Sequence, residues 1–137
     1  MPVKMVIHGL GQAPDSGEPL VLLKDAARER YLVIGIGPLE IMGIAAALSG
    51  SSPPRPMTHD LLCSAIGACG GRVTHAVISA LVDNVFHARL VLDVEGRHAE
   101  LDARSSDAMA VAVRVGIPIL VEEAVLEQAA GGRPPDI

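Results

Sequence analysis

Hydrophobic and polar residues alternate over a stretch near the middle of the chain, which predicts strands. In residues 85–94 every second side chain from Phe86 to Leu92 is apolar, and polar residues dominate the opposite face. Glu95-Gly96 then favours a tight turn, so residues 97–103 are expected to pair back as a hairpin. Shorter apolar runs bounded by turn residues predict further strands at residues 5–10, 19–24, 30–36, 73–81 and 117–121.

Other segments repeat apolar residues with the spacing of a helix. Gly37-Pro38 stops a strand and suits the start of a helix, and apolar residues then recur at helical spacing up to Gly50. Thr58 is suited to cap a second helix, and Ser105 or Ser106 a third, so capping is the expected role of these hydroxyls. The later helices are predicted at residues 58–69, 105–115 and 122–130.

These elements predict an α+β domain with a mixed, mostly antiparallel sheet or half-barrel and three to four helices. One domain is expected at residues 1–130, followed by a flexible tail at residues 131–137. Residues 37–45 also line up with residues 104–112, each after a strand hairpin, which indicates an internal β-β-α duplication. This duplication places Glu40 and Asp107 in equivalent first turns of two helices.

Composition narrows the classes of partner. Half of the 137 residues are hydrophobic, so the chain is not disordered, but it has one Phe, one Tyr and no Trp. The net charge of −5 and the lack of aromatic platforms disfavour sustained nucleic-acid binding. Transient contact with DNA or RNA as the substrate of a metal-using enzyme stays compatible with this charge, because a bound cation inverts the local field.

The pattern of apolar residues indicates the oligomeric state and the cellular location to expect. Their abundance and aliphatic character favour a homodimer or a higher homo-oligomer. No run approaches the roughly 18 apolar residues that span a bilayer. The first ten residues lack the long apolar region of a signal peptide. A cytoplasmic protein without a membrane partner is therefore expected.

Carboxylates at the predicted helix starts are the first candidates for chemistry. Glu40 and Asp107 lie in first turns, and Asp102 precedes the third helix at the end of a strand. An oxygen-rich cluster of this kind can hold Mg²⁺ or Mn²⁺ and generate the hydroxide that hydrolyses a phosphodiester. The alternative is structural, because a carboxylate in a first turn stabilises the helix dipole by about 0.3–1 kcal/mol.

The second candidate group surrounds the predicted start of the second helix. His59 is suited to act as a general base or metal ligand, with Asp60 as a ligand or orienting partner. Arg55 and Arg104 are suited to bind a phosphate. The alternatives are a solvated imidazole, a first-turn acid and surface arginines in salt bridges.

Five ordered segments of the sequence resemble the bifunctional nuclease family, a domain linked to DNase and RNase activity. The similarity runs from about Val21 to Ala129, and its segments are residues 34–40, 55–62, 83–88, 102–108 and 118–123. Two positions depart from the family pattern: Ser105 stands where proline is typical, and His87 where tyrosine is common. The resemblance implies a nuclease that acts on both DNA and RNA.

Two hypotheses of different classes follow. The leading one is a nuclease that hydrolyses DNA and RNA phosphodiester bonds with weak sequence preference and depends on a divalent metal, Mg²⁺ or Mn²⁺. Its expected catalytic residues are His59, Asp60 and Asp107, with Arg55 and Arg104 on the substrate and Glu40, Asp102 and Asp107 on the metal. The alternative is a non-enzymatic oligomeric binding or regulatory module, with a pocket for an anionic small molecule at helix N-termini. The nuclease hypothesis requires at least three of the acids and His59 to converge in one open cleft.

Overall fold

The computed structural model describes residues 1–50 and 52–129. The predicted tail at residues 131–137 lies outside the described residues. The elements are β1 (Val3–Gln12), β2 (Pro19–Asp25), β3 (Tyr31–Gly35), α1 (Pro38–Ser49), α2 (Thr58–Ala68), β4 (Gly71–Val82), β5 (Val85–Val94), β6 (Arg97–Arg104), α3 (Ser105–Val115), β7 (Ile119–Val121) and α4 (Glu123–Gln128). No helix among the described residues is long and apolar enough to cross a membrane.

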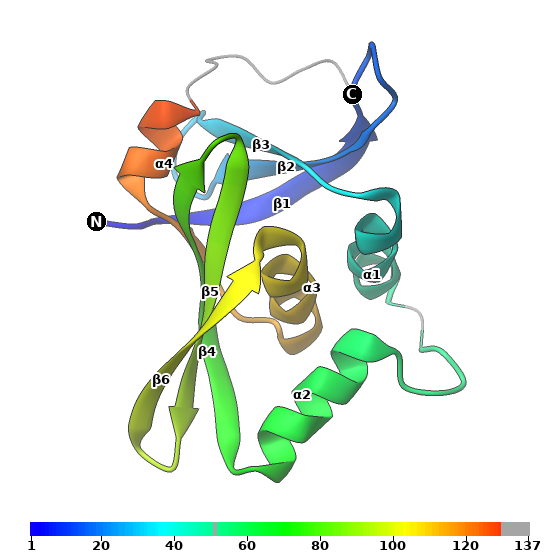
Figure 1. Cartoon of the computed structure of the whole chain (residues 1–137), viewed down its shortest axis with the longest axis vertical. Helices are drawn as coiled ribbons and strands as arrows, with labels where there is room; N and C mark the ends of the chain where they lie inside the picture. Colours follow the sequence, from blue (N-terminus) through cyan, green and yellow to red (C-terminus); the bar gives the residue numbers. More distant parts are fainter. Residues whose placement is uncertain (51, 130–137) are drawn as a thin grey trace.

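The strands of the described residues belong to one mixed sheet in the order β3-β2-β1-β7-β4-β5-β6 (Figure 1). The short strand β7 lies between β1 and β4, antiparallel to β1 and parallel to β4. Every other neighbouring pair of described strands is antiparallel. The sheet does not close, so the α+β class with a mostly antiparallel open sheet is confirmed.

The two halves of the chain repeat the same order of elements. Strands β1, β2 and β3 form an antiparallel meander that leads into α1, and β4, β5 and β6 form a second meander that leads into α3. Each repeat has one strand more than the predicted β-β-α unit. Glu40 and Asp107 each occupy the third position of the helix that ends a repeat, as the alignment of the two segments predicts.

Helix α3 lies between the β4–β6 hairpins and the helices α1 and α2 (Figure 1). Residues 108–112 of this helix are buried, and three of these five are alanines, whose small side chains let neighbouring elements approach closely. Ile44 of α1 is also fully buried in the same core. Because α3 is packed on several sides, the residues at its N-terminal end are held in fixed positions relative to α1 and α2.

The predicted caps of two helices are wrong by one or two residues. Thr58 is the first residue of α2, and the N-cap is Met57, whose backbone N–H donates to Asp60 Oδ2 at 2.9 Å. Arg104 is the N-cap of α3, so Ser105 and Ser106 lie inside its first turn. Capping therefore does not explain these two serines. At the other ends, Gly50 and Gly116 terminate α1 and α3 in the left-handed conformation, as expected.

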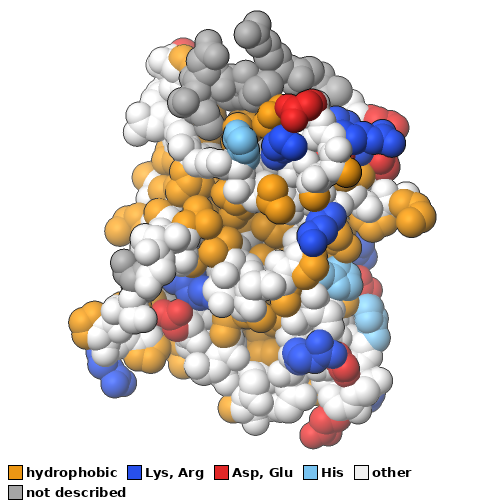
Figure 2. All heavy atoms as spheres, turned by 180° about the vertical axis from the view of Figure 1, so that it is seen from behind, with side chains coloured by type: hydrophobic (Ala, Val, Ile, Leu, Met, Phe, Trp, Pro, Cys, Tyr) orange, Lys and Arg blue, Asp and Glu red, His pale blue; other side chains and the backbone are white. Residues whose placement is uncertain are grey.

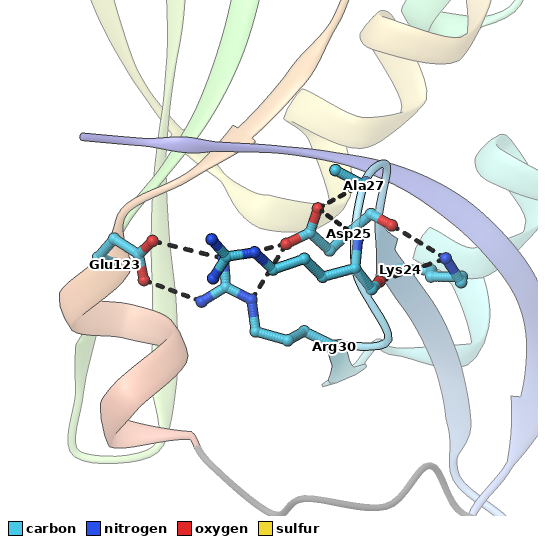
Figure 3. A network of polar contacts seen from close by, with 6 residues as sticks. Lys24, Asp25, Ala27, Arg30 and Glu123 are labelled. Carbon is cyan, nitrogen blue, oxygen red and sulfur yellow. Dashed lines mark hydrogen bonds and ion pairs between the residues drawn. The ribbon is translucent and has the colours of Figure 1, made fainter.

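A polar network joins the β2–β3 turn to the start of α4 (Figure 3). The buried carboxylate of Asp25 accepts hydrogen bonds from the backbone N–H of Ala27 at 2.8 Å and from Arg30 Nε at 3.0 Å. Arg30 also donates to Glu123 at 3.1 Å. The Ala27 N–H in particular, opposed by burial and aided by Arg30, lowers the pKa of Asp25. This network contains none of the candidate site residues, and it ties the β2–β3 turn to α4.

Candidate functional site

Four side chains from three separate segments meet where α1, α2 and α3 begin. The Nε2 atom of His59 lies 2.9 Å from Oδ1 of Asp107. Arg104 donates from Nε to Oδ2 of Asp107 at 2.8 Å and from Nη1 to Oε1 of Glu40 at 3.1 Å. We call these residues the helix-start cluster: Glu40, His59, Arg104 and Asp107.

The local sequence explains why each member faces this point. Glu40 and Asp107 lie in first turns, where the free backbone N–H groups favour negative charge. Arg104 is the last residue of β6, so its side chain leaves the sheet at the point where α3 starts. His59 is the second residue of α2, and α2 packs against α3. Three helix starts thus supply two acids, one imidazole and one guanidinium.

The charges around Asp107 keep its carboxyl ionised. Burial raises the pKa of Asp107, but hydrogen bonds from Arg104 and His59 outweigh it and hold this pKa below its ordinary value of 3.8. Because an ionised carboxylate only accepts hydrogen bonds, the neutral imidazole of His59 carries its proton on Nε2. Its Nδ1 is then the nitrogen that is able to take up a proton.

Two glycines, one at the N-cap of α1 and one inside the helix, leave space for the cluster. A Cβ at Gly43 would lie 3.0 Å from both Nδ1 and Cε1 of His59. A Cβ at Gly37 would overlap the carboxylate of Glu40. The His59 ring therefore lies directly against α1, with 15% of its side chain exposed. Gly43 was not among the predicted site residues, although a glycine inside a helix is itself a signal of close packing.

Asp60 belongs to a second contact and does not join the cluster. Its Oδ1 accepts a hydrogen bond from Arg114 Nε at 2.8 Å, and Arg114 also donates to the carbonyl oxygen of Gly43 at 2.9 Å. The backbone N–H of Met57, together with Arg114, lowers the pKa of Asp60. Asp60 thus ties α2 to α3 and α1, which positions the neighbouring His59. Arg114 is a further residue that the sequence pattern did not indicate.

The remaining candidates lie elsewhere. Arg55 is exposed in the segment before α2 and has no ion pair among the described residues. Asp102 is exposed on the edge strand β6, where it pairs in register with Arg89 of β5. Neither contacts the helix-start cluster in the described part of the chain. The convergence that the nuclease hypothesis requires is therefore met in part, by Glu40, Asp107 and His59.

The predicted metal ligands do not form a metal site in this arrangement. Over residues 1–50 and 52–129, no group of three or more His, Cys, Asp or Glu side chains is arranged to hold a metal ion. The cation that joins Glu40 to Asp107 is the guanidinium of Arg104. A resident Mg²⁺ or Mn²⁺ held by Glu40, Asp102 and Asp107 does not fit these positions, and metal dependence stays a prediction.

A pocket of about 470 Å³ opens beside the cluster. It lies among the end of β3, the start of α1, the β4–β5 turn and the start of α3, and Glu40 and Arg104 form part of its wall. Cavities of this size accommodate small organic ligands. The helix-start cluster is therefore at the border of a space large enough for part of a substrate.

Comparison with known proteins identifies the family of the chain. The family model described as the bifunctional nuclease domain matches residues 21–132. Two proteins of Mycobacterium tuberculosis, named as uncharacterised in strains CDC 1551 and H37Rv, are each 43% identical to this chain over 123 residues. Each match covers 90% of this chain and 73% of the relative. The chain belongs to the bifunctional nuclease domain family.

Proposed function

We propose that the protein hydrolyses phosphodiester bonds of DNA and RNA with weak sequence preference, and that the helix-start cluster is its active site. The observation that carries this proposal is the contact of His59 with an ionised Asp107, next to Arg104. Phosphodiester hydrolysis needs a general base and a cationic group, which the imidazole oriented by Asp107 and the guanidinium of Arg104 in the pocket wall supply. Membership of the bifunctional nuclease domain family supports the same reaction class.

His59 acts as the general base in this proposal. Its Nδ1 takes a proton from a water molecule while the water oxygen attacks phosphorus. The P–O bond to the leaving nucleotide breaks, and the departing oxygen takes a proton from solvent. Asp107 orients the ring and stabilises the imidazolium that forms. A positioned general base of this kind contributes about 10²–10⁴-fold to the rate.

Arg104 binds the phosphate that is cleaved. Its side chain is 64% exposed, and the recorded contacts to Asp107 and Glu40 use three of the five guanidinium N–H donors. The remaining donors are able to bind phosphate oxygens, and the charge stabilises the transition state. Glu40 holds the guanidinium from the other side and fixes its orientation.

Dependence on Mg²⁺ or Mn²⁺ is a separate part of the proposal, and the chemistry above does not require it. A metal would polarise the phosphate and lower the pKa of water. A cleavage assay run with Mg²⁺, with Mn²⁺ and with EDTA distinguishes a metal-dependent reaction from one that needs no metal. Loss of cleavage in EDTA supports the metal, whereas full cleavage in EDTA supports a reaction carried by His59 and Arg104 alone.

The test uses labelled single- and double-stranded DNA and RNA and compares wild-type protein with His59→Ala. His98→Ala is the matched control, because His98 lies on β6 in a contact with Glu100 and is largely exposed. We expect His59→Ala to lose cleavage and His98→Ala to retain it. Equal cleavage by all three proteins, prepared identically, indicates a contaminating nuclease and contradicts the proposed site.

We also propose that the protein is a homodimer. Hydrophobic side chains gather in a broad area on the face opposite to that of Figure 1 (Figure 2). Helix α1 alone exposes 78% of Leu39 and 59% of Met42, which lie on one side of the helix. An exposed aliphatic face of this kind favours association with a second copy.

A non-enzymatic binding module remains the alternative function, because Asp60 and Asp102 stand apart from the cluster.

A further inference from the structure

The wall of the pocket beside the helix-start cluster has polar groups without protein partners among the described residues. Ser105 and Ser106 line it, and they are only 8% and 6% exposed. Neither hydroxyl has a hydrogen-bond partner among the residues that the structure describes. Their oxygen atoms are not among the buried polar atoms that lack a partner in the described residues, so these hydroxyls are open to the pocket and suited to bind a ligand.

Two helix starts border the same pocket. Gly37 and Arg104 are the N-caps of α1 and α3, and no side chain caps either helix in the described part of the chain. The first backbone N–H groups of both helices are therefore without side-chain acceptors, and they attract a negative group. Together with the serine hydroxyls and Arg104, these N–H groups form a site suited to phosphate oxygens.

The pocket wall also offers a surface suited to a planar apolar group. Phe86, the only phenylalanine of the chain, lines the pocket and is half-buried against the core. The neighbouring turn presents Asn84, which has a positive φ of 63°. An aromatic ring stacks on any nucleobase, and an amide can both donate to a base edge and accept from it.

Two carboxylates in the pocket wall restrict the chemical class of ligand that the pocket is suited to bind. Glu18 is exposed at the border of the pocket, and Glu40 forms part of the wall near Arg104. Carboxylates only accept hydrogen bonds, so they favour the amino and hydroxyl groups of a nucleoside. They repel a small anion that has no amino or hydroxyl groups to donate to them. The pocket is thus better suited to a nucleotide than to a free phosphate ion.

We propose that this pocket binds one unpaired nucleotide, with its base on Phe86 and its phosphate at Ser105, Ser106 and the two helix starts. A stacked base must leave its duplex, so the preferred substrate is single-stranded nucleic acid, with the scissile phosphate at Arg104. This preference rests on the proposed function. Binding of a nucleotide in the pocket does not, because it needs no cleavage.

The test measures binding of nucleoside monophosphates to the 137-residue His59→Ala protein by calorimetry in EDTA, with nucleosides and inorganic phosphate as the other probes. The background change removes the proposed base without touching the pocket. Phe86→Leu tests the stacking surface, and the double change of Ser105→Ala with Ser106→Ala tests the phosphate end. Alanine favours a helix, so the double variant is expected to fold. Ser64→Ala, on the exposed side of α2, is the matched control.

We expect the monophosphates to bind more tightly than nucleosides or inorganic phosphate. Each pocket variant should weaken binding by about tenfold, and Ser64→Ala should leave it unchanged. If Phe86→Leu unfolds the protein, Asn84→Gly replaces it, because glycine tolerates the positive φ. Absence of saturable binding, or equal binding by all folded variants, overturns the inference. Inorganic phosphate binding as tightly as a nucleotide overturns the base site.

The inference and the proposed function fail in different ways. If wild-type protein cleaves nucleic acid while the pocket variants bind nucleotides normally, the pocket assignment is wrong and the active site stands. If nucleotides bind through the pocket and no protein cleaves any substrate, the nuclease proposal is wrong and the pocket stands. Equal cleavage of single- and double-stranded substrates by wild-type protein contradicts the single-strand preference.

Discussion

His59 and Asp107 are 48 residues apart in sequence, and yet Nε2 of one lies 2.9 Å from Oδ1 of the other. The contact joins the first turn of α2 to the first turn of α3. It holds the imidazole in the form that carries its proton on Nε2, and leaves Nδ1 as the proton acceptor. The nuclease proposal depends on this pair more than on any other contact in the molecule.

Gly43→Ala tests the close approach of α1 to His59. The added Cβ would lie 3.0 Å from Nδ1, so the ring must move by a few tenths of an ångström. Replacing a helical glycine by alanine stabilises a helix by about 1 kcal/mol, which offsets the crowding. We therefore expect a folded protein with little change in melting temperature and at least about tenfold lower kcat, since small misplacement of a catalytic group is costly. Unchanged kcat would show that Nδ1 has no role.

Arg104→Lys tests the geometry of the phosphate contact. Lysine keeps the charge but cannot donate to Asp107 through two nitrogens and to Glu40 at the same time. We expect KM to rise and kcat to fall, by about tenfold each. Steady-state cleavage of a labelled oligonucleotide measures both. Arg97→Lys, at the exposed first residue of β6, should retain wild-type kinetics. Wild-type kinetics in Arg104→Lys would show that the reaction needs only a positive charge at this position, and not the geometry of the guanidinium.

Asp25 gives a prediction about stability and pH. The backbone N–H of Ala27 is the largest of the causes that lower its pKa below 3.8. The ionised form is thus stabilised in the folded protein, and this stabilisation is present above pH 3.8 and is lost as pH falls through the lower folded value. Asp25→Asn should reduce the free energy of unfolding at neutral pH by about 1–3 kcal/mol and flatten its acid dependence.

Urea unfolding at a series of pH values measures this effect. Asp15→Asn is the control, because Asp15 is exposed in the β1–β2 loop and its side chain accepts a hydrogen bond from the backbone N–H of the neighbouring Ser16. A protein with Asp25→Asn that shows the wild-type pH dependence below pH 5 would mean that Asp25 is not the group that titrates with unfolding.

The oligomeric state is tested at the exposed side of α1. Light scattering after gel filtration should give twice the mass of the chain for the wild-type protein. Leu39→Ser together with Met42→Ser should give a monomer of unchanged melting temperature, because both side chains are mostly exposed within one chain. A wild-type monomer contradicts the homodimer. A dimer in the double variant places the interface elsewhere.

Much of the fold could be predicted because it depends on local pattern. Alternation between residues 85 and 94 indicated β5, and Pro38 and Gly50 indicated the ends of α1. The internal alignment correctly placed Glu40 and Asp107 in equivalent first turns. It could not show that both acids bind the same Arg104, because that contact depends on how the two repeats pack across α3.

Asp102 and Asp60 are close in sequence to residues of the helix-start cluster but do not join it. Asp102 is two residues from Arg104 but stays on the sheet, since the chain leaves β6 only at the start of α3. Asp60 follows His59 directly, but successive residues of a helix point about 100° apart, and it faces Arg114 instead of the cluster. The serines were expected to cap α3, and Arg104 holds that position because the helix begins one residue earlier than a Ser105 cap would require.

The most direct test of the proposed active site is a double-mutant comparison of cleavage by His59→Ala, Asp107→Asn and the protein with both changes. If the two residues act as one unit, each single change lowers kcat by about 10²–10⁴-fold and the double change lowers it no further than the more severe single change. Wild-type kcat in either single variant would contradict the account. So would a double variant whose loss is the product of the two single losses.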